Sequence, residues 1–455
     1  MWISEHKRIS KRGVHSLKNL ANLSASQAAK ALAQREIKAE HLLLDCLNQI
    51  GVRESHVHAW VSLGKEHAIR TAQELDRGAV QGILHGLPIG VKDLFDTHDL
   101  PTYYGSPIYG NNHPVCDAVS VSLMREAGAI ILGKTVTTEF ASFKPGPTKN
   151  PRNLNHTPGG SSSGSAAAVA DCMVPLATGS QTAASIIRPA SFCGVVGYKP
   201  TYGLVSRDGA LAQSFLLDQV GVIARNVEDV ALCSSVIIKK DLQDKSTISY
   251  PTEDFLNRVQ AKPFFEPQLI FIATSKWKNL DEDAKKDFEK FLKKIDKQVT
   301  VYSNPSYFEK IFDYHKIIHE TDMAYNFLST YEKHKKKIGK KMIEAIERGL
   351  SYKAKDYAEA VDQIAIIYDT FKEAFHHYHA IITPATTGYA PKGLSYTGSP
   401  EFCTTWTYLG MPAITLPLIE GSGKLPLGVQ LVGEKLDDVR LLQTANWLLK
   451  KNKKK

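Results

Sequence analysis

The chain has 455 residues, of which 43% are hydrophobic and 23% are charged, close to the averages of globular proteins. These proportions exclude a mostly disordered chain, and 31 glycines with 21 prolines exclude a collagen-like or linker-dominated sequence. The formal net charge of +9 suggests a nucleic-acid partner, but the basic residues concentrate at both termini and in a cluster at 333–341. We interpret them as a solvated face and basic tails, and we expect no nucleic-acid partner.

Helix and strand patterns alternate in the first third of the chain. Apolar residues at helical spacing predict one helix over 24–50 and a second over 65–77. A short apolar strand with glycines follows at 86–95, then a helix at 121–127 and a buried strand at 129–133. This alternation predicts an α/β fold.

The remaining chain continues the same pattern after a segment rich in small residues at 145–203. Apolar residues inside that segment demand burial, so we expect closely approached backbone around a site rather than a linker. No run of about 18 apolar residues occurs, so we predict no membrane span. We predict a polar connection at 239–263. The helix expected at 281–297 lies between strands expected at 268–273 and 299–302, which together form a βαβ-like unit. Further helices are expected within 307–375 and at 439–449, and further strands at 380–384, 413–418 and 427–431.

Six cysteines are scattered along the chain without any C-x-x-C pair, which argues against a zinc ribbon or a thioredoxin-like site. In a chain of this length they indicate reduced, buried thiols in a cytoplasmic protein. The basic start of the chain lacks an apolar stretch, so we do not expect a secretory signal.

Two serine-containing turns carry the first chemical signal. Residues 159–165 (GGSSSGS) and 179–185 (GSQTAAS) each precede an apolar run. Such turns can direct backbone N–H groups and a hydroxyl into one cavity, as a nucleophile with an oxyanion hole requires. A phosphate loop is the competing interpretation, but Gly164 is followed by Ser165 and Ala166 rather than by Lys and Ser or Thr.

A serine nucleophile needs a base, and no histidine lies within these turns. His156 is the nearest histidine. Lys92 is the stronger candidate, because a lysine in an apolar strand is desolvated, which lowers its pKa and leaves a neutral amine able to accept a proton.

Three motifs follow one another along the chain: a lysine strand at 86–93 (GLPIGVKD), a glycine–serine turn at 159–163 (GGSSS), and a serine segment at 185–201 (SIIRPA, then CGVVGYKPT). Ser161 and Ser185 are 24 residues apart. Together these features resemble the amidase signature family of serine amidohydrolases. The resemblance runs from about 86 to 225 and resumes at Thr383-Pro384, 409–413 and 428–431.

The resemblance implies a catalytic triad without a metal or cofactor. Ser185 would be the nucleophile, and Lys92 would be the base. Ser161, which would follow a cis peptide bond, would relay the proton between them. The product is an acyl-enzyme that water then hydrolyses. The backbone N–H groups of Thr182, Ala183, Ala184 and Ser185 would form the oxyanion hole, and Ser162, Arg188 and Asp218 would support the site structurally.

One feature departs from the family, which usually has Gly-Gly before the nucleophile where this chain has Ala183-Ala184. Alanine tolerates positive φ poorly, so a loop that needs positive φ would be strained or reshaped. A weakly active or non-catalytic member acting as a binding module is therefore an alternative.

The resemblance also implies one large α/β domain at 21–449, with a mixed central sheet covered by helices on both faces. Within it we expect a catalytic core at about 80–240 and 380–449 and a helical region at about 264–375 that shapes the pocket, between a loose basic N-terminus at 1–20 and a basic tail at 450–455. Four aromatic residues are candidate pocket lining: Tyr103, Tyr104, Phe143 and Trp406.

The expected substrate is a small amide, or an ester, cleaved to a carboxylate and ammonia or an amine, and a homodimer is the expected form if the protein associates. The alternative within the family is the A subunit of a tRNA-dependent amidotransferase. There, an Asp-Ile-Phe-Thr stretch precedes the C-terminal motif, whereas this chain has GSPEFCTTW at 398–406, so the glutamine-binding carboxylate is not at the expected place.

Overall fold

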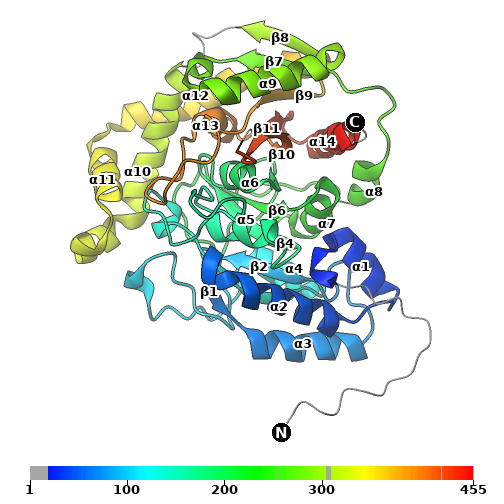
Figure 1. The fold of residues 1–455 in the computed structure, drawn as a ribbon. Helices are drawn as coiled ribbons and strands as arrows, with labels where there is room; N and C mark the ends of the chain where they lie inside the picture. The colour runs from blue at the N-terminus through cyan, green and yellow to red at the C-terminus, as the bar shows by residue number, and fades with distance from the viewer. Residues whose placement is uncertain (1–18, 253, 304–308, 422, 454–455) are drawn as a thin grey trace.

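A mixed sheet of eleven strands runs through the computed structural model, which describes residues 19–252, 254–303, 309–421 and 423–453. The strand order is β1-β3-β2-β4-β6-β5-β10-β11-β9-β7-β8, and helices flank both faces, as predicted (Figure 1). The strands are β1 (Trp60–Leu63), β2 (Pro88–Lys92), β3 (Ile130–Thr135), β4 (Leu176–Gln181), β5 (Val196–Lys199), β6 (Gln219–Ala224), β7 (Leu269–Ala273), β8 (Val299–Ser303), β9 (Ala380–Pro384), β10 (Ala413–Glu420) and β11 (Pro426–Val432).

The helices gather into groups along the chain. In Figure 1, α1 to α3 lie together at one end of the molecule and α10 to α12 lie along one flank. The helices are α1 (Ala25–Ala33), α2 (Ala39–Val57), α3 (Lys65–Arg77), α4 (Val119–Glu126), α5 (Ser163–Ala170), α6 (Ile187–Cys193), α7 (Val227–Ile237), α8 (Phe255–Gln260), α9 (Glu282–Lys294), α10 (Glu309–His334), α11 (Lys340–Ser351), α12 (Ala354–Lys372), α13 (Glu401–Tyr408) and α14 (Asp438–Lys453).

The predicted helix at 24–50 is wrong as a single element, because the chain breaks it between α1 and α2. Arg35 adopts a positive φ of 57° just after α1 ends. The carboxylate of Asp76, on α3, then accepts the N–H groups of Ala39 at 2.7 Å and Glu40 at 3.1 Å, which satisfies the first turn of α2. A tertiary contact therefore starts the second helix, and helical periodicity alone does not show it.

The centre of the sheet determines where the functional turns lie. Strand β2 is parallel to β4, and β4 is antiparallel to β6. Because parallel strands end at the same edge, the end of β2 at Lys92 and the end of β4 at Gln181 lie together. Helix α5 begins within one serine turn, at Ser163, and α6 begins just after the other, at Ile187.

From β7 onward the chain follows the predicted pattern except for α13, and the elements β4, β5, β6, α7 and α8 before β7 were not predicted individually. Strand β7, helix α9 and strand β8 form the predicted βαβ unit, with β7 parallel to β8. The predicted polar connection at 239–263 contains the short helix α8, whose Phe255 and Val259 are buried. Helix α14 continues to Lys453, beyond the boundary predicted at 449, and the predicted N-terminal segment 1–20 lies almost wholly outside the described residues.

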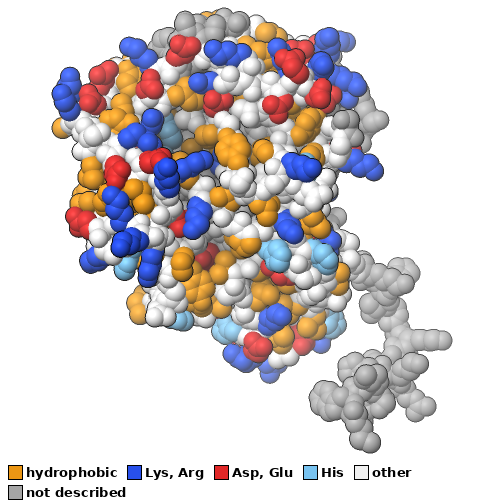
Figure 2. Space-filling view, turned by 60° about the vertical axis from the view of Figure 1, so that its left-hand side comes forward, with side chains coloured by type: hydrophobic (Ala, Val, Ile, Leu, Met, Phe, Trp, Pro, Cys, Tyr) orange, Lys and Arg blue, Asp and Glu red, His pale blue; other side chains and the backbone are white. Residues whose placement is uncertain are grey.

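The basic cluster at 333–341 lies where α10 ends and α11 begins. Figure 2 shows basic and acidic side chains intermixed on the face that α10 to α12 contribute to. Lys335 pairs with Glu347 at 2.8 Å, and Lys340 lies 3.9 Å from Glu344. This face is therefore mixed in charge, which agrees with the interpretation of the cluster as a solvated surface.

Cysteines and membrane-spanning potential complete the description. All six cysteines are free; Cys116 is exposed and Cys172 is half-buried, so the expectation of burial holds only for the other four. Among the described helices, none combines the length and apolar character that crossing a membrane requires.

Candidate active site

Lys92 ends strand β2 with its side chain fully buried. Its Nζ lies 2.7 Å from Oγ of Ser161 and 2.7 Å from Oγ of Ser180. Burial lowers the pKa of Lys92 well below 10.5, opposed only in part by the charge of Asp218. Burial therefore favours the neutral amine, whose lone pair can accept a proton from a neighbouring hydroxyl.

Ser161 lies in a turn whose backbone is held by residues of helix α6. The Gly160–Ser161 peptide bond is cis, and Gly159 before it has a φ of +83°, where an added Cβ would clash with α6. The Arg188 guanidinium donates to the Gly160 carbonyl from Nε at 3.1 Å and from a terminal nitrogen at 2.8 Å. Arg188 thus holds the turn that presents the Ser161 hydroxyl to Lys92.

Ser185 lies in the turn between β4 and α6 and is 9% exposed. The N–H of Ser162 donates to the Ser185 carbonyl at 3.2 Å, which ties the two serine turns together. In the part of the chain that the structure describes, no hydrogen bond joins the hydroxyls of Ser161 and Ser185. The structure therefore brings Lys92 and Ser161 into hydrogen-bond contact and places Ser185 on the adjoining turn.

Four consecutive backbone N–H groups, at 182–185, donate to no other described residue. The next two N–H groups, of Ile186 and Ile187, both donate to Oε1 of Gln181, at 2.9 and 3.0 Å. Buried N–H groups without a partner are rare in folded proteins. A row of such donors beside a serine hydroxyl is the arrangement that stabilises a developing oxyanion.

The Ala183-Ala184 pair does not use the conformations that only glycine adopts easily. Neither residue is among the described residues with positive φ. Ala184 is completely buried, and Ala183 is half-buried. The strain considered for these positions is therefore absent, and the N–H groups at 182–185 remain available for a ligand.

Asp218 supports this loop from the side. Its carboxylate accepts the Thr182 hydroxyl at 2.6 Å and the N–H groups of Gln213 at 2.7 Å and Ser214 at 2.9 Å. Burial raises the pKa of Asp218, while these hydrogen bonds favour the charged form. The structure gives Asp218 a bonding role toward Thr182 and no contact with a serine hydroxyl of the candidate triad.

Two loop carbonyls are held by residues that the sequence does not single out. His315, on α10, has its Nε2 at 2.9 Å from the Thr182 carbonyl. The hydroxyl of Thr407, on α13, donates to the Ala183 carbonyl at 2.8 Å. No motif marks either residue. Ser180 lies in the 179–185 turn, but the sequence does not indicate its contact with Lys92.

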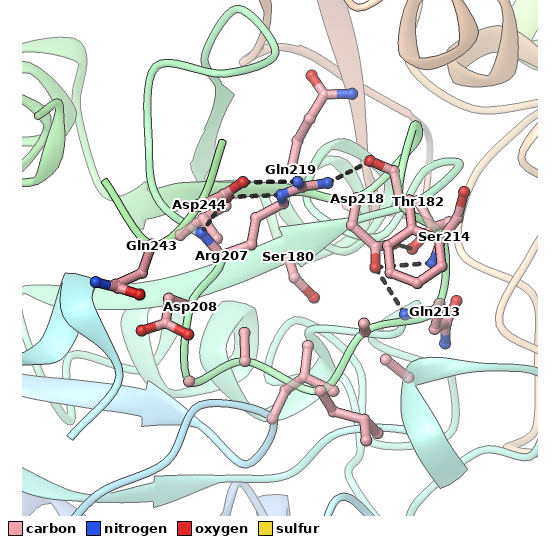
Figure 3. Close-up of a pocket in the computed structure, with 18 residues that line it drawn as sticks. Ser180, Thr182, Arg207, Asp208, Gln213, Ser214, Asp218, Gln219, Gln243 and Asp244 are labelled. Carbon is pink, nitrogen blue, oxygen red and sulfur yellow. Dashed lines mark hydrogen bonds and ion pairs between the residues drawn. The ribbon is translucent and has the colours of Figure 1, made fainter. Parts of the chain in front are cut away.

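A cavity of about 270 Å³ opens beside this edge of the sheet (Figure 3). Ser180 and Thr182 form part of its wall, so it reaches the hydroxyl that contacts Lys92. Arg207 lines it with its guanidinium paired to Asp244, at 2.9 Å through both Nε and a terminal nitrogen. Asp208 and Ser180 both line the cavity, and both are labelled in Figure 3.

The four aromatic residues predicted as pocket lining do not line this cavity. Trp406 is 2% exposed and packs edge-to-face on Phe371 within the core. Tyr104 donates its hydroxyl to Asp96 at 2.6 Å, whereas Tyr103 and Phe143 line two separate surface hollows. Trp406 is thus a core residue, and the structure offers no support for the other three as substrate contacts.

Two further groups with histidine side chains lie outside the serine turns. The His156 ring is buried in part, and its Nδ1 has no hydrogen-bond partner among the described residues. Over the same residues, the one cluster with metal-ligand spacing is His98, Asp99 and Asp117. Arg125 binds both of those carboxylates, at 2.6 and 2.9 Å, so the cluster is accounted for by ion pairs.

Comparisons with known proteins show what the whole chain is similar to. The family model described as Amidase matches residues 41–442. The A subunit of glutamyl-tRNA(Gln) amidotransferase from Natranaerobius thermophilus is 31% identical over 94% of this chain and 95% of its own length, and that from Bacillus pumilus is 33% identical over 92% and 95%.

Solved structures give the same result. The A subunit of glutamyl-tRNA(Gln) amidotransferase from Thermotoga maritima is similar, with 29% identity and a TM-score of 0.78 over 94% of each chain. A peptide amidase in complex with the competitive inhibitor chymostatin has 25% identity and a TM-score of 0.83, over 95% of this chain and 98% of the other. The similarity thus extends over the whole described fold and is not confined to the serine turns.

Proposed function

This chain belongs to the amidase family, whose members act on amide carbon–nitrogen bonds, and we propose that it hydrolyses a small amide through an acyl-enzyme on Ser185. The observation that carries the proposal is the buried Lys92 amine, 2.7 Å from the Ser161 hydroxyl, beside the unpaired N–H groups at 182–185. In this proposal Lys92 is the base, Ser161 is the hydroxyl relay and the N–H groups at 182–185 are the oxyanion hole.

In the proposed reaction, Lys92 accepts the proton of Ser161 as Ser161 accepts that of Ser185. The Ser185 oxygen attacks the substrate carbonyl carbon, and the N–H groups at 182–185 stabilise the resulting oxyanion. The intermediate collapses, the carbon–nitrogen bond breaks, and the leaving amine takes up the proton. Water then attacks the ester through the same relay, releasing a carboxylate and regenerating Ser185.

A second candidate function is that of an amidotransferase A subunit, because relatives at 31 to 33% identity carry that name. Glu401, the acidic residue of the 398–406 segment, accepts from Asn279 at 3.0 Å. Glu401 is also not among the residues that line the cavity beside the serine turns, so the 398–406 segment supplies no carboxylate there, which favours the stand-alone amidase. A cytoplasmic location and a possible homodimer are part of the same proposal.

Ammonia release from a panel of primary amides, with glutamine and asparagine included, tests the proposal and separates the two candidates. We expect the purified chain to release ammonia from simple amides and the Ser185→Ala variant to release none. Turnover confined to glutamine or asparagine would favour the amidotransferase function. Equal ammonia release by both proteins would contradict the proposed nucleophile.

A further inference from the structure

The oxyanion loop is held on its carbonyl side by residues from outside the segment that contains it. The Thr182 carbonyl faces Nε2 of His315 at 2.9 Å, and the Ala183 carbonyl accepts the Thr407 hydroxyl at 2.8 Å. His315 is 6% exposed on α10, and Thr407 is fully buried on α13. Both side chains therefore reach the loop from elements whose sequences carry no motif for this chemistry.

Peptide geometry connects these carbonyl contacts to the N–H groups on the other side of the loop. In a planar trans peptide, the C=O and the following N–H point in opposite directions. The bond between Thr182 and Ala183 carries the Thr182 carbonyl and the Ala183 N–H, and the next bond carries the Ala183 carbonyl and the Ala184 N–H. A donor that fixes each carbonyl consequently fixes the direction of the N–H that follows it.

We propose that His315 and Thr407 are positioning residues that aim the Ala183 and Ala184 N–H groups at the oxyanion formed on the substrate. The inference rests on the proposed function and deepens it, since it assigns the aim of the oxyanion hole to α10 and α13. It also accounts for an Ala-Ala loop without positive φ: external hydrogen bonds hold the conformation, so the loop does not depend on glycine.

The bonding around His315 is consistent with a neutral donor. A carbonyl oxygen can only accept, so the His315 Nε2 must carry the hydrogen. Burial lowers the pKa of His315 to about 4, and the ring stays neutral above that pH. Its neighbour His319 lies edge-on at 5.6 Å and contacts the Gln213 side chain at 3.2 Å, away from the loop carbonyls.

Conservative and disruptive variants separate positioning from packing. His315→Ala removes one donor, and Thr407→Val removes one donor together with the acceptor of the Gln181 side-chain N–H at 2.9 Å. His315→Gln keeps a donor at about the same place, and Thr407→Ser keeps both functions of the hydroxyl. His319→Ala and Thr404→Val are matched controls, because Thr404 donates to Pro400 within the start of its own helix at 3.0 Å. Melting temperatures of all six variants show which of them fold.

The readout is the rate of Ser185 modification by a fluorophosphonate probe, resolved into a binding constant and a maximal rate. We expect His315→Ala and Thr407→Val to lower the maximal rate about 10- to 100-fold, below the roughly 10²–10³ seen when an oxyanion donor is lost outright. The binding constant should change less than about 3-fold. The Gln and Ser variants and both controls should stay within about 3-fold of the unmodified chain.

Three results would overturn the inference in distinguishable ways. If the folded His315→Ala and Thr407→Val variants react as fast as the unmodified chain, the loop does not need these donors, and the proposed function stands. If His315→Ala does not fold, an equal loss in His315→Gln and Thr407→Ser would assign the effect to packing. If the chain without any substitution does not react with the probe at Ser185, both the inference and the proposed function are contradicted.

Discussion

The small-residue segment at 159–188 and the helical region of α10 to α12 contribute to one site in different ways. The first supplies the reacting hydroxyls and the N–H groups, and its turns are recognisable in the sequence. The second supplies His315 to the Thr182 carbonyl and Asp322 to the Ser214 hydroxyl, at 2.9 and 2.5 Å, from an ordinary helix. The reacting hydroxyls and the N–H groups are therefore local in sequence, while Lys92 and the contacts that orient the loop come from distant parts of the chain.

Lys92 should show the largest effect, because the proposed proton transfer depends on it. We expect Lys92→Ala to lower kcat/KM by about 10²–10⁴, the usual contribution of a general base. Lys92→Arg should be equally inactive, since a guanidinium does not give up its proton near neutral pH. Steady-state hydrolysis of the best amide substrate measures both. Substantial activity in the Arg variant would mean that position 92 needs only a buried cation.

The pH dependence of the unmodified chain tests the same group. Because burial lowers the pKa of Lys92 well below 10.5, the neutral amine persists to correspondingly lower pH. Activity should be lost as the pH falls through the lowered pKa, since protonation removes the base. The profile of kcat/KM against pH measures this. An activity that appears only near pH 10.5 would contradict a desolvated lysine.

The Asp218 carboxylate accepts hydrogen bonds from three groups around the loop, so its removal tests how far these contacts stabilise the site. Asp218→Ala leaves the Thr182 hydroxyl and two N–H groups without this acceptor. We expect a loss of about 2–4 kcal/mol in the free energy of unfolding, because each unsatisfied buried group costs roughly 1–3 kcal/mol. Asp218→Asn should lose less. Urea unfolding followed by circular dichroism measures both, and equal stability in all three proteins would show the bonds to be dispensable.

An effect of similar size concerns the pH dependence of stability in the helical region. Burial lowers the pKa of His315 to about 4 from 6.5, so the unfolded state takes up the proton first on acidification. The stability associated with the neutral ring is present above pH 6.5 and is lost as the pH falls toward 4, by roughly 3 kcal/mol for this group. His315→Gln should show a correspondingly shallower loss over that window in urea unfolding at several pH values. Identical slopes would place the ring in solvent.

The sequence predicts the parts of this protein whose signal is local. The strand that carries Lys92, the two serine turns and the βαβ unit follow from short patterns and are found in the structure. The break after α1 does not follow, because Asp76 on α3 starts α2 through a tertiary contact. The sequence does not distinguish His315 from other residues of a long helix, because its contact with the Thr182 carbonyl forms only in the folded chain.

Two further errors have the same physical origin. Trp406 is a candidate for pocket lining as an aromatic residue, and the fold buries it against Phe371. The concern about Ala183-Ala184 assumed that the loop must obtain its shape from its own residues. In the structure, neighbours hold the Thr182 and Ala183 carbonyls, which no local pattern in the loop can reveal.

The proposed function depends above all on Ser185 being a nucleophile activated by Lys92. Labelling with a fluorophosphonate probe, followed by peptide mass mapping of the unmodified chain and of Ser185→Ala and Lys92→Ala, tests this most directly. We predict one modified peptide containing Ser185, no modification of Ser185→Ala, and much slower modification of Lys92→Ala. A folded chain that reacts at another residue, or reacts at Ser185 equally fast without Lys92, would contradict the proposal.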